Sequence, residues 1–389
     1  MKDLIKPDYK AQGIINLMSS ISKNFGHNHK YNQSKFLKSK ELSKHKNVIL
    51  IVFDGLGYNY LKKKKDSFLC KHLKAKMTST FLPTTACANT SYLTGYPPNQ
   101  SGFTGWDVYL KEVGSIVSVL RFMPKHGGPV LDEHGFKMSH ILPIEPCTKD
   151  YKSENYLFID KKISKSAFTD HIAKYSKVVP ITSVTDMSNK LVKKVKSKSV
   201  KRRYFHVYLP EFDGSAHEFG VNHKNTSKIF EKIDRKIEEI SKKIQGTNTK
   251  LIIVSDHGFV DTTAKTRLTT DNIPGFDECL SMPLSGDARV VYAYLKKGSD
   301  LKFRKVFNKH LKDIAYLFES KKLVEKNYFG LFTPTPKLLD RVGDYTIIMK
   351  KNYAIKSKLA NYKKKNAHVG EHSGTTEDEM YCPLVHIDC

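Results

Sequence analysis

The sequence contains no uninterrupted apolar stretch that approaches the ~20 residues of a membrane-spanning helix. Residues 1–15 carry charges and no apolar segment followed by a small-residue cleavage site, so we expect no secretory signal peptide. The six cysteines are widely scattered and form no C-x-x-C pair, which disfavours a zinc finger or a disulfide framework. Together these absences predict a cytoplasmic protein without a membrane span.

Acidic residues are scarce beside the basic ones: 39 Asp and Glu stand against 66 Lys and Arg, a formal charge of +27 over 389 residues. Such a charge attracts polyanions, so nucleic acid is a possible partner. The lysines are spread along the whole chain, as on a solvated surface, and no zinc finger or RNP motif accompanies them. The charge therefore identifies no specific nucleic-acid function, and the sequence is silent on the oligomeric state.

Continuous apolar runs and one amphipathic helix indicate the fold class. Residues 48–53 read VILIVF, which is typical of a parallel strand buried on both faces. Further strands are expected at 177–181, 204–209, 251–254, 288–295, 345–349 and 383–387. Isoleucines recur every three or four residues within 227–245, which predicts an amphipathic helix closed by Gly246. Strands that alternate with helices predict an α/β fold with a doubly wound, mostly parallel central sheet and helices on both faces.

The composition changes at about residue 45. Residues 1–45 are polar and lysine-rich, with one weak helical stretch near 9–21, and are expected to form an N-terminal extension. Residues 46–389 carry the strand pattern and are expected to form the main domain. Within that domain, about 272–365 is less regular, which predicts a smaller peripheral or cap region around the central sheet.

Carboxylate and imidazole side chains follow three of the predicted strands. The residues are Asp54, Asp213, His217, Asp256 and His257, joined by His372 in a glycine-flanked loop before the last strand. In an open parallel sheet, functional groups gather at the carboxyl ends of the strands. Each aspartate alone is more often a cap or turn residue. Their joint occurrence after core strands favours a metal site, because carboxylate and imidazole are good ligands for Zn²⁺.

A hydroxyl-rich turn at 81–85 enters a predicted short helix over 86–93. The hydroxyl of Thr85 would meet oriented N–H groups and the positive dipole end at the start of this helix. That environment suits an alkoxide that attacks a phosphate. The alternative is an N-cap threonine without a chemical role.

Five motifs in order carry a resemblance to a known family. They are Asp54-Gly55, Pro83-Thr84-Thr85 followed by Thr94-Gly95, Asp213-x-x-x-His217, Ser255-Asp256-His257-Gly258 and Gly370-Glu371-His372-x-Gly374. Their order and spacing resemble the alkaline phosphatase superfamily, and within it the type I phosphodiesterase/nucleotide pyrophosphatase branch. The resemblance covers about 48–387. It implies an alkaline phosphatase-like catalytic domain and the hydrolysis of phosphodiester or pyrophosphate bonds in small nucleotide-type substrates.

The resemblance also implies the roles of the motif residues. One zinc ion would be held by Asp54, Asp256 and His257, with Thr85 as the fourth ligand. The other would be held by Asp213, His217 and His372, with one position open for substrate. Thr85 fits the nucleophile position, ten residues before the glycine of the Thr-Gly pair, and its attack implies a phospho-threonine intermediate. Two Zn²⁺ are the implied cofactors, although Mn²⁺ or another divalent ion also suits an Asp/His shell.

The sequence departs from the family downstream of the nucleophile. The family carries an asparagine there that donates to a phosphate oxygen, whereas this chain reads GFTGW at 102–106. Asn89 is a candidate replacement, and a structural amide is its alternative role. Trp106 is a candidate for stacking on a base, and packing is its alternative. Arg121 and Lys125 would lie in a cap over the site or in a generic surface loop.

Other activities on the same metal residues remain as alternatives. A phosphonate or phosphomonoester hydrolase would use the same two metals, but no arginine lies between Thr85 and Arg121, which favours diesters. A sulfatase is excluded because Cys87 is followed by Ala-Asn-Thr rather than by the required motif. Cofactor-independent phosphoglycerate mutases contain a large inserted domain, for which the interval 107–204 is short. A non-catalytic protein that binds nucleic acid is disfavoured because the metal-shell residues are all present.

Overall fold

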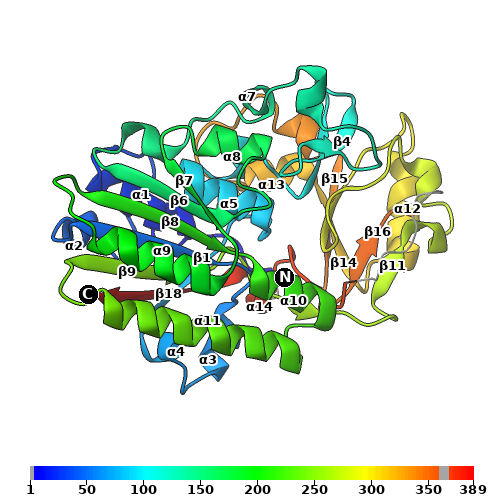
Figure 1. Cartoon of the computed structure of the whole chain (residues 1–389). Helices are drawn as coiled ribbons and strands as arrows, with labels where there is room; N and C mark the ends of the chain where they lie inside the picture. The colour runs from blue at the N-terminus through cyan, green and yellow to red at the C-terminus, as the bar shows by residue number, and fades with distance from the viewer. Residues whose placement is uncertain (1–3, 359–367) are drawn as a thin grey trace.

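The computed structural model of the protein describes residues 4–358 and 368–389. Its central sheet has seven strands in the order β2-β18-β9-β1-β8-β6-β7 (Figure 1). The strands are β1 (Asn47–Phe53), β2 (Leu73–Thr78), β6 (Glu154–Asp160), β7 (Lys177–Ile181), β8 (Arg203–Leu209), β9 (Thr249–Val254) and β18 (Tyr381–Asp388). All neighbouring pairs from β9 to β7 are parallel, and β18 runs antiparallel to both of its neighbours. The predicted mostly parallel sheet is therefore confirmed.

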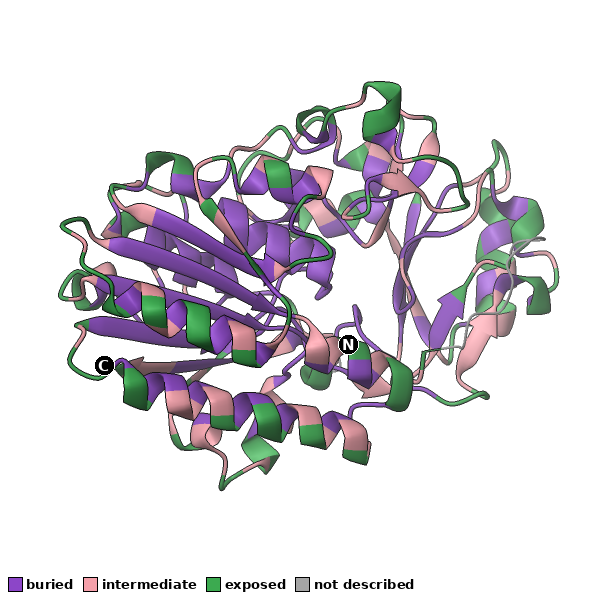
Figure 2. Ribbon diagram, viewed as in Figure 1, coloured by how far each residue is buried: buried purple, intermediate pink, exposed green. Residues whose placement is uncertain are grey.

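Alternate residues of β1 enter two separate hydrophobic clusters. Val48, Leu50 and Val52 pack on one face of the sheet, whereas Ile49, Ile51 and Phe53 pack on the other. The first face is covered by α1 (Ile14–Asn24) and α5 (Thr85–Thr94), and the second by α9 (Val184–Lys196) and α11 (Lys224–Lys243). Figure 2 shows the strands in the middle of the central sheet buried along most of their length. A strand that is buried on both faces explains the continuous apolar run in the sequence.

Helix α11 follows the predicted isoleucine pattern with shifted ends. Its buried side chains include Ile233, Ile237 and Ile240, while lysines and glutamates occupy the opposite face. The helix begins three residues before the predicted start, where the side chain of His223 accepts a hydrogen bond from the backbone N–H of Asn225. It ends at Lys243, two residues before the predicted end. The periodicity identified the helix, but the cap at its start carries no strong sequence signal.

The segment before β1 packs closely on the central sheet. Ile14, Leu17 and Ile21 of α1 are at most 1% exposed and belong to the same hydrophobic cluster as one face of β1. The Arg202 guanidinium next to β8 donates hydrogen bonds to the backbone oxygens of Asn24 (3.0 Å) and Leu42 (3.1 Å). The predicted division at residue 45 stays a prediction, and the described residues before it share the core of the main sheet.

A second sheet, entirely antiparallel, contains seven strands in the order β14-β15-β13-β12-β3-β4-β5. They are β3 (Asp107–Leu110), β4 (Ser115–Ser118), β5 (Met123–Pro124), β12 (Ser285–Asp287), β13 (Val290–Ala293), β14 (Ala315–Glu319) and β15 (Tyr345–Met349). Most of this sheet comes from the predicted peripheral region, whose last part, 359–365, lies outside the described residues. Residues 107–124, for which no strand was predicted, supply three strands. Figure 1 shows the second sheet beyond the carboxyl ends of β1 and β8.

The remaining helices and strands lie around the two sheets. The helices are α2 (Ser39–Leu42), α3 (Tyr58–Lys63), α4 (Phe68–Lys71), α6 (Pro98–Ser101), α7 (Met138–Ile141), α8 (Ala167–Ile172), α10 (Glu211–Phe219), α12 (Asp300–His310), α13 (Ser320–Glu325) and α14 (Glu377–Met380). The remaining strands pair in twos: β10 (Val260–Asp261) with β17 (Gly370–Glu371), and β11 (Arg267–Thr269) with β16 (Ala354–Lys356). Within the described ranges, no helix is long and apolar enough to cross a membrane.

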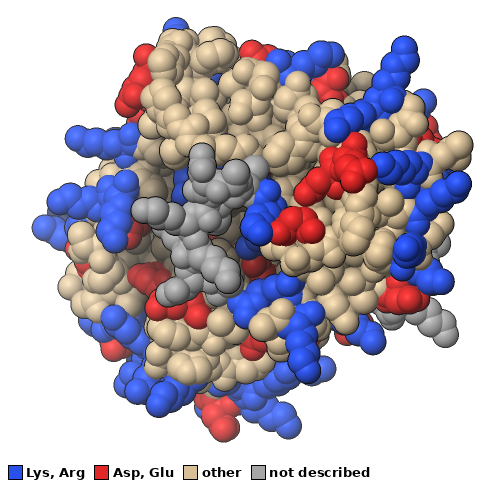
Figure 3. Space-filling model, turned by 90° about the vertical axis from the view of Figure 1, so that its right-hand side faces the viewer, with Lys and Arg blue, Asp and Glu red and all other residues tan. Residues whose placement is uncertain are grey.

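Basic side chains are dispersed over the surface that Figure 3 shows. Lys and Arg are spread over this face, with Asp and Glu between them, and no continuous basic stripe is visible there. This distribution agrees with the expectation of a solvated, lysine-rich surface. Binding of nucleic acid stays a prediction from net charge alone.

Candidate metal centre

Three aspartates meet at the carboxyl edge of the central sheet because the strands that precede them end in register. Phe53 of β1 pairs with Leu209 of β8, and Val52 pairs with Val254 of β9. Asp54 directly follows β1, and Asp256 stands two residues after β9. Asp213 lies in the first turn of α10, which follows β8 after a single residue. Parallel pairing thus brings together carboxylates that are about 40–200 residues apart in the sequence.

The first group of potential ligands consists of Asp54, Asp256 and His257. One ligand atom from each lies within 4.8 Å of the others. Nε2 of His257 is 3.3 Å from Oδ1 of Asp54 and 3.6 Å from Oδ2 of Asp256. All three residues are at most 1% exposed. The Thr85 hydroxyl lies next to this group, with Oγ1 3.3 Å from Nε2 of His257.

The second group consists of Asp213, His217 and His372, again with ligand atoms within 4.8 Å of one another. Oδ1 of Asp213 is 3.4 Å from Nε2 of His217 and 4.0 Å from Nε2 of His372. Nδ1 of His217 donates to the backbone oxygen of Gly370 at 2.9 Å, which leaves Nε2 with the lone pair that a metal ligand needs. The rings of His257 and His372 stack at 3.8 Å, so the two groups adjoin.

Hydrogen bonds fix one oxygen of two of these carboxylates and leave the other oxygen bare. Oδ1 of Asp256 accepts from the backbone N–H groups of Gly55 (3.1 Å) and His257 (3.0 Å). The Tyr208 hydroxyl donates to Oδ2 of Asp54. In the described part of the chain, Oδ1 of Asp54, Oδ1 of Asp213 and Oδ2 of Asp256 are buried without a hydrogen-bond partner. Bare buried carboxylate oxygens are unfavourable unless a cation compensates them, so this donor set fits divalent metal ions.

Burial of these Asp and His side chains also shifts their pKa values. Burial raises the pKa of Asp256 to about 8 and that of Asp213 to about 7. Burial, reinforced by the charge of Asp213, also raises the pKa of Asp54. Burial lowers the pKa of His217 to about 4 and lowers that of His372. The imidazoles of His217 and His372 are therefore neutral near pH 7, as metal ligands must be, whereas ionised carboxylates require a nearby positive charge.

Thr85 is the first residue of α5, as its position just before the predicted helix 86–93 suggested. The helix ends with Gly95 at φ +81°, a left-handed conformation that favours glycine. Thr85 is 7% exposed. Its hydroxyl therefore lies at the N-terminus of a two-to-three-turn helix and beside the first ligand group, while the rest of the helix packs on the sheet.

The family model for type I phosphodiesterase / nucleotide pyrophosphatase matches residues 48–375, most of the chain. The chain belongs to this family. Membership confirms the family that the five motifs indicated and makes the protein a hydrolase of the phosphodiesterase/nucleotide pyrophosphatase class. No curated protein sequence matches the chain.

Solved structures of similar fold are ectonucleotide pyrophosphatase/phosphodiesterases 5. An inactive variant of the mouse protein in complex with AMP has a TM-score of 0.65 at 16% identity. The unmutated mouse protein has a TM-score of 0.64 and the human protein one of 0.63, each at 17% identity. In all three comparisons the match covers 87% of each chain. At this level of identity the comparison establishes the shared α/β fold.

The two candidate substrate-binding residues have different surroundings in this family member. Asn89 lies one helical turn after Thr85, is 6% exposed, and its Oδ1 has no hydrogen-bond partner among the described residues. Trp106 is half-buried against the main core, and the Arg121 guanidinium lies 5.9 Å from its ring centroid. Lys125 forms an ion pair with Asp107 at 3.0 Å. The substrate roles of Asn89 and Trp106 stay predictions.

Sequence reasoning missed two residues beside the ligand groups. Tyr208 stands in the apolar run of β8, where its hydroxyl was indistinguishable from that of a core tyrosine. Asp287 of β12 accepts a hydrogen bond from the Thr84 hydroxyl at 2.8 Å, although 203 residues separate the two. Burial, assisted by the charge of Glu371, raises the pKa of Asp287 to about 6. The one signal in the sequence was that Tyr208 stands near the end of a strand that leads to Asp213, and nothing near Asp287 in the sequence pointed to Thr84.

A third group of potential ligands overlaps the second. It consists of His217, His368 and Glu371. Oε1 of Glu371 already pairs with the Lys356 ammonium at 2.8 Å, and His217 belongs to the second group. Because two of its three members have partners, this group is an extension of the second group rather than a separate site.

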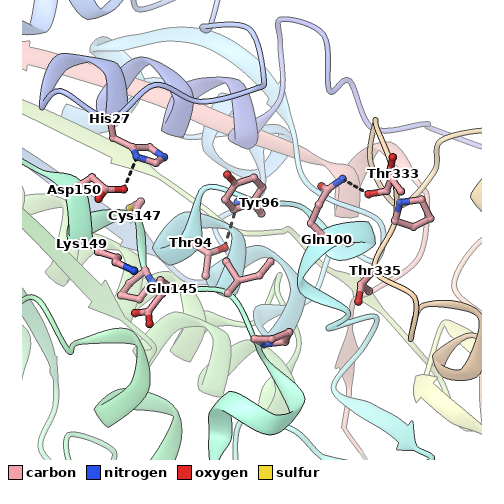
Figure 4. Close-up of a pocket in the computed structure, with 14 residues that line it drawn as sticks. His27, Thr94, Tyr96, Gln100, Glu145, Cys147, Lys149, Asp150, Thr333 and Thr335 are labelled. Atoms are coloured by element: carbon pink, nitrogen blue, oxygen red, sulfur yellow. Dashed lines mark hydrogen bonds and ion pairs between the residues drawn. The ribbon is translucent and has the colours of Figure 1, made fainter.

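A cavity of about 540 Å³ lies at the other end of α5 (Figure 4). Thr94 and Tyr96 line it, together with His27, whose Nδ1 pairs with Asp150 at 2.8 Å. None of the residues in the two ligand groups lines this cavity. The N-terminus of α5 therefore faces the ligand groups, and its C-terminus faces a separate cavity.

Proposed function

We propose that this family member hydrolyses phosphodiester or pyrophosphate bonds of nucleotide-type substrates through a phospho-threonine intermediate on Thr85. The observation that carries the proposal is the position of the Thr85 hydroxyl, 3.3 Å from His257 and beside two adjoining ligand groups. The alternative of a capping threonine without a chemical role does not apply to Thr85, because the N-cap of α5 is Thr84.

Two divalent cations would fit the groups Asp54, Asp256, His257 and Asp213, His217, His372. When bound, such ions supply the positive charge that lowers the pKa of a hydroxyl nucleophile and stabilises developing negative charge on oxygen. Asp and His ligands suit Zn²⁺ best, and Mn²⁺ or another divalent ion is compatible with the same donors. The bare oxygens of the three aspartates support this assignment.

The chain's own residues would carry the two chemical steps. Thr85 Oγ1 forms a bond to phosphorus while the bond from phosphorus to the leaving oxygen breaks, and the hydroxyl proton passes to solvent. The leaving alcohol or phosphate departs with a proton from solvent. Water then attacks the phosphorus of the phospho-threonine ester, the bond to Oγ1 breaks, and the threonine hydroxyl is regenerated. Each displacement inverts the configuration at phosphorus, so the complete reaction proceeds with retention.

Substitution of the nucleophile tests the proposal. Thr85→Ala should abolish hydrolysis of bis-p-nitrophenyl phosphate by zinc-loaded protein, with zinc content and thermal unfolding close to wild type. Thr94→Ala is the matched control, because that hydroxyl lies at the opposite end of α5 and donates to the backbone oxygen of Thr90. Wild-type turnover by a folded, zinc-loaded Thr85→Ala protein would contradict the proposal.

A substrate panel separates the proposed diesterase from activities on the same ligand groups. We expect diesters and dinucleotide pyrophosphates to be hydrolysed with higher kcat/KM than p-nitrophenyl phosphate or a phosphonate. No arginine in the sequence between Thr85 and Arg121 is available to hold the second charge of a monoester. A preference for the monoester or the phosphonate would replace the diesterase assignment with the corresponding alternative.

A further inference from the structure

The residue before the nucleophile occupies the N-cap of α5 but does not cap it. Thr84 has the extended backbone of an N-cap residue, with φ −145° and ψ 150°. A threonine in this position ordinarily accepts a hydrogen bond from the second or third N–H of the helix. The Thr84 side chain makes no such bond. Its hydroxyl instead donates to Oδ2 of Asp287 at 2.8 Å.

This arrangement leaves the first N–H groups of the helix open beside the nucleophile. The N–H groups of Cys87 and Ala88 donate to the backbone oxygen of Thr84, at 3.0 and 2.9 Å. Within residues 4–358 and 368–389, the N–H groups of Thr85 and Ala86 have no hydrogen-bond acceptor. A capping Thr84 side chain would compete for the N–H of Ala86. Open N–H groups at a helix N-terminus attract the oxygens of a phosphate.

The position of Asp287 is fixed by the close approach of β12 to β13 on one side and to the residues just before β3 on the other. A Cβ on Gly286, at φ +94°, would lie 2.6 Å from the backbone oxygen of Val290. A Cβ on Gly105 would lie 2.8 Å from Cα of Gly286. Glycine at both positions therefore lets β12 lie close to β13 and to the segment that leads into β3. Oδ1 of Asp287 accepts from the backbone N–H of Ala288 at 2.8 Å, which orients the carboxylate toward Thr84.

From these contacts we infer that Asp287 is a positioning residue for the phosphoryl-transfer step. It holds the Thr84 hydroxyl away from the start of α5, so that the N–H of Ala86 remains available to a non-bridging oxygen of the substrate. Asp287 belongs to neither ligand group, and its contact with the nucleophile turn is through Thr84. The inference rests on the proposed role of Thr85.

The first test removes the acceptor and asks which kinetic constant changes. Asp287→Ala should lower kcat and kcat/KM for bis-p-nitrophenyl phosphate by the same factor, about 10- to 100-fold. The reason is that the freed Thr84 hydroxyl would occupy the N–H of Ala86, which donates to the substrate in the transition state. Inhibition by orthovanadate, which requires no turnover, should weaken by a similar factor. Asp287→Asn can keep its amide oxygen on the N–H of Ala288 and donate an amide N–H to the Thr84 hydroxyl oxygen, so it still holds that hydroxyl and should stay within about threefold of wild type. Zinc content should be unchanged in both variants.

The second test is a double-mutant cycle with the residue that Asp287 holds. Thr84→Val removes the hydroxyl, so the N–H of Ala86 has no competitor whether or not Asp287 is present. The double variant Thr84→Val with Asp287→Ala should therefore match Thr84→Val alone and exceed Asp287→Ala. Asp287→Leu fills the volume without an acceptor, and it replaces Asp287→Ala in the cycle if thermal unfolding shows that the alanine variant is not folded.

Two results would overturn the inference. Wild-type kcat in folded Asp287→Ala or Asp287→Leu would show that Asp287 does not act on the site. A double variant as impaired as Asp287→Ala would show that Asp287 acts by a route other than the Thr84 hydroxyl. Thr85→Ala is measured in parallel. If that variant still turns over substrate, the assignment of Thr85 as the nucleophile is wrong, and this failure is distinct from a failure of the Asp287 contact.

Discussion

The side chains that surround the Thr85 hydroxyl have distinct contacts that account for their positions. The Tyr208 hydroxyl and backbone N–H groups occupy one oxygen each of Asp54 and Asp256, and the opposite oxygens are left bare. The Gly370 carbonyl fixes the ring of His217 in a similar way. Such second contacts orient ligands and select the histidine tautomer. The ligand groups are therefore preorganised by the chain itself.

The assignment of His217 and His372 to one metal group makes a stoichiometric prediction. His217→Ala and His372→Ala should each lower the zinc content of the purified protein by about one ion per chain, because both remove a ligand from the same ion. His368→Ala is the matched control and should keep both zinc ions, since its ring lies 4.3 Å from that of His217 but His368 is not one of the six proposed ligands. Elemental analysis gives the ratio. Two full zinc ions in either alanine variant would remove that histidine from the ligand set.

At the scale of elements, α1 extends the core beyond the predicted boundary at residue 45. Leu17 is fully buried on the face of the central sheet that α5 also covers. Leu17→Ala should lower the free energy of unfolding by about 2–5 kcal/mol, through lost transfer energy and the cavity that remains. Urea unfolding measures the change. Lys23→Ala on the exposed side of the same helix should change stability by less than about 0.5 kcal/mol; equal effects of the two variants would contradict the assignment of α1 to the core.

Strands and ligands were predictable to different extents from the sequence. β1, β8 and β9 are buried on both faces, so their apolar runs are continuous, and the aspartates that follow them were visible as ligand candidates. β2 exposes alternate residues and its sequence, LKAKMT, carries no apolar run, so it was missed. Strands β3 to β5 are short, and the pairing of β3 with β12 joins segments more than 150 residues apart. The Thr84–Asp287 contact depends on that pairing, so no local pattern indicates it.

At the scale of the whole molecule, the buried aspartates make the stability of the fold depend on pH and on bound metal ions. The pKa of Asp213 is raised to about 7 and that of Asp256 to about 8, from about 3.9 in an unfolded chain. Without metal, the folded protein therefore holds protons that the unfolded chain has released, and its stability falls as pH rises toward 8. The lowered pKa of His217 acts in the opposite direction, but only below about pH 6.5.

The metal-free protein should therefore lose thermal stability between pH 6.5 and 8, and zinc should raise its Tm more at pH 8 than at pH 6.5. Bound cations stabilise the ionised carboxylates, which removes the penalty. Calorimetry with and without a chelator measures both effects. Asp213→Asn is the control and should show a smaller fall. A Tm of the metal-free protein that is constant or rises over this interval would contradict the prediction.

The central claim is that Thr85 forms a covalent ester with the phosphoryl group before water releases the product. The stereochemical course at phosphorus tests it most directly, with a phosphorothioate diester of known configuration hydrolysed in isotopically labelled water. Two successive in-line displacements predict overall retention. Overall inversion would mean that water attacks the substrate in a single step, and it would contradict the account of Thr85 as the nucleophile.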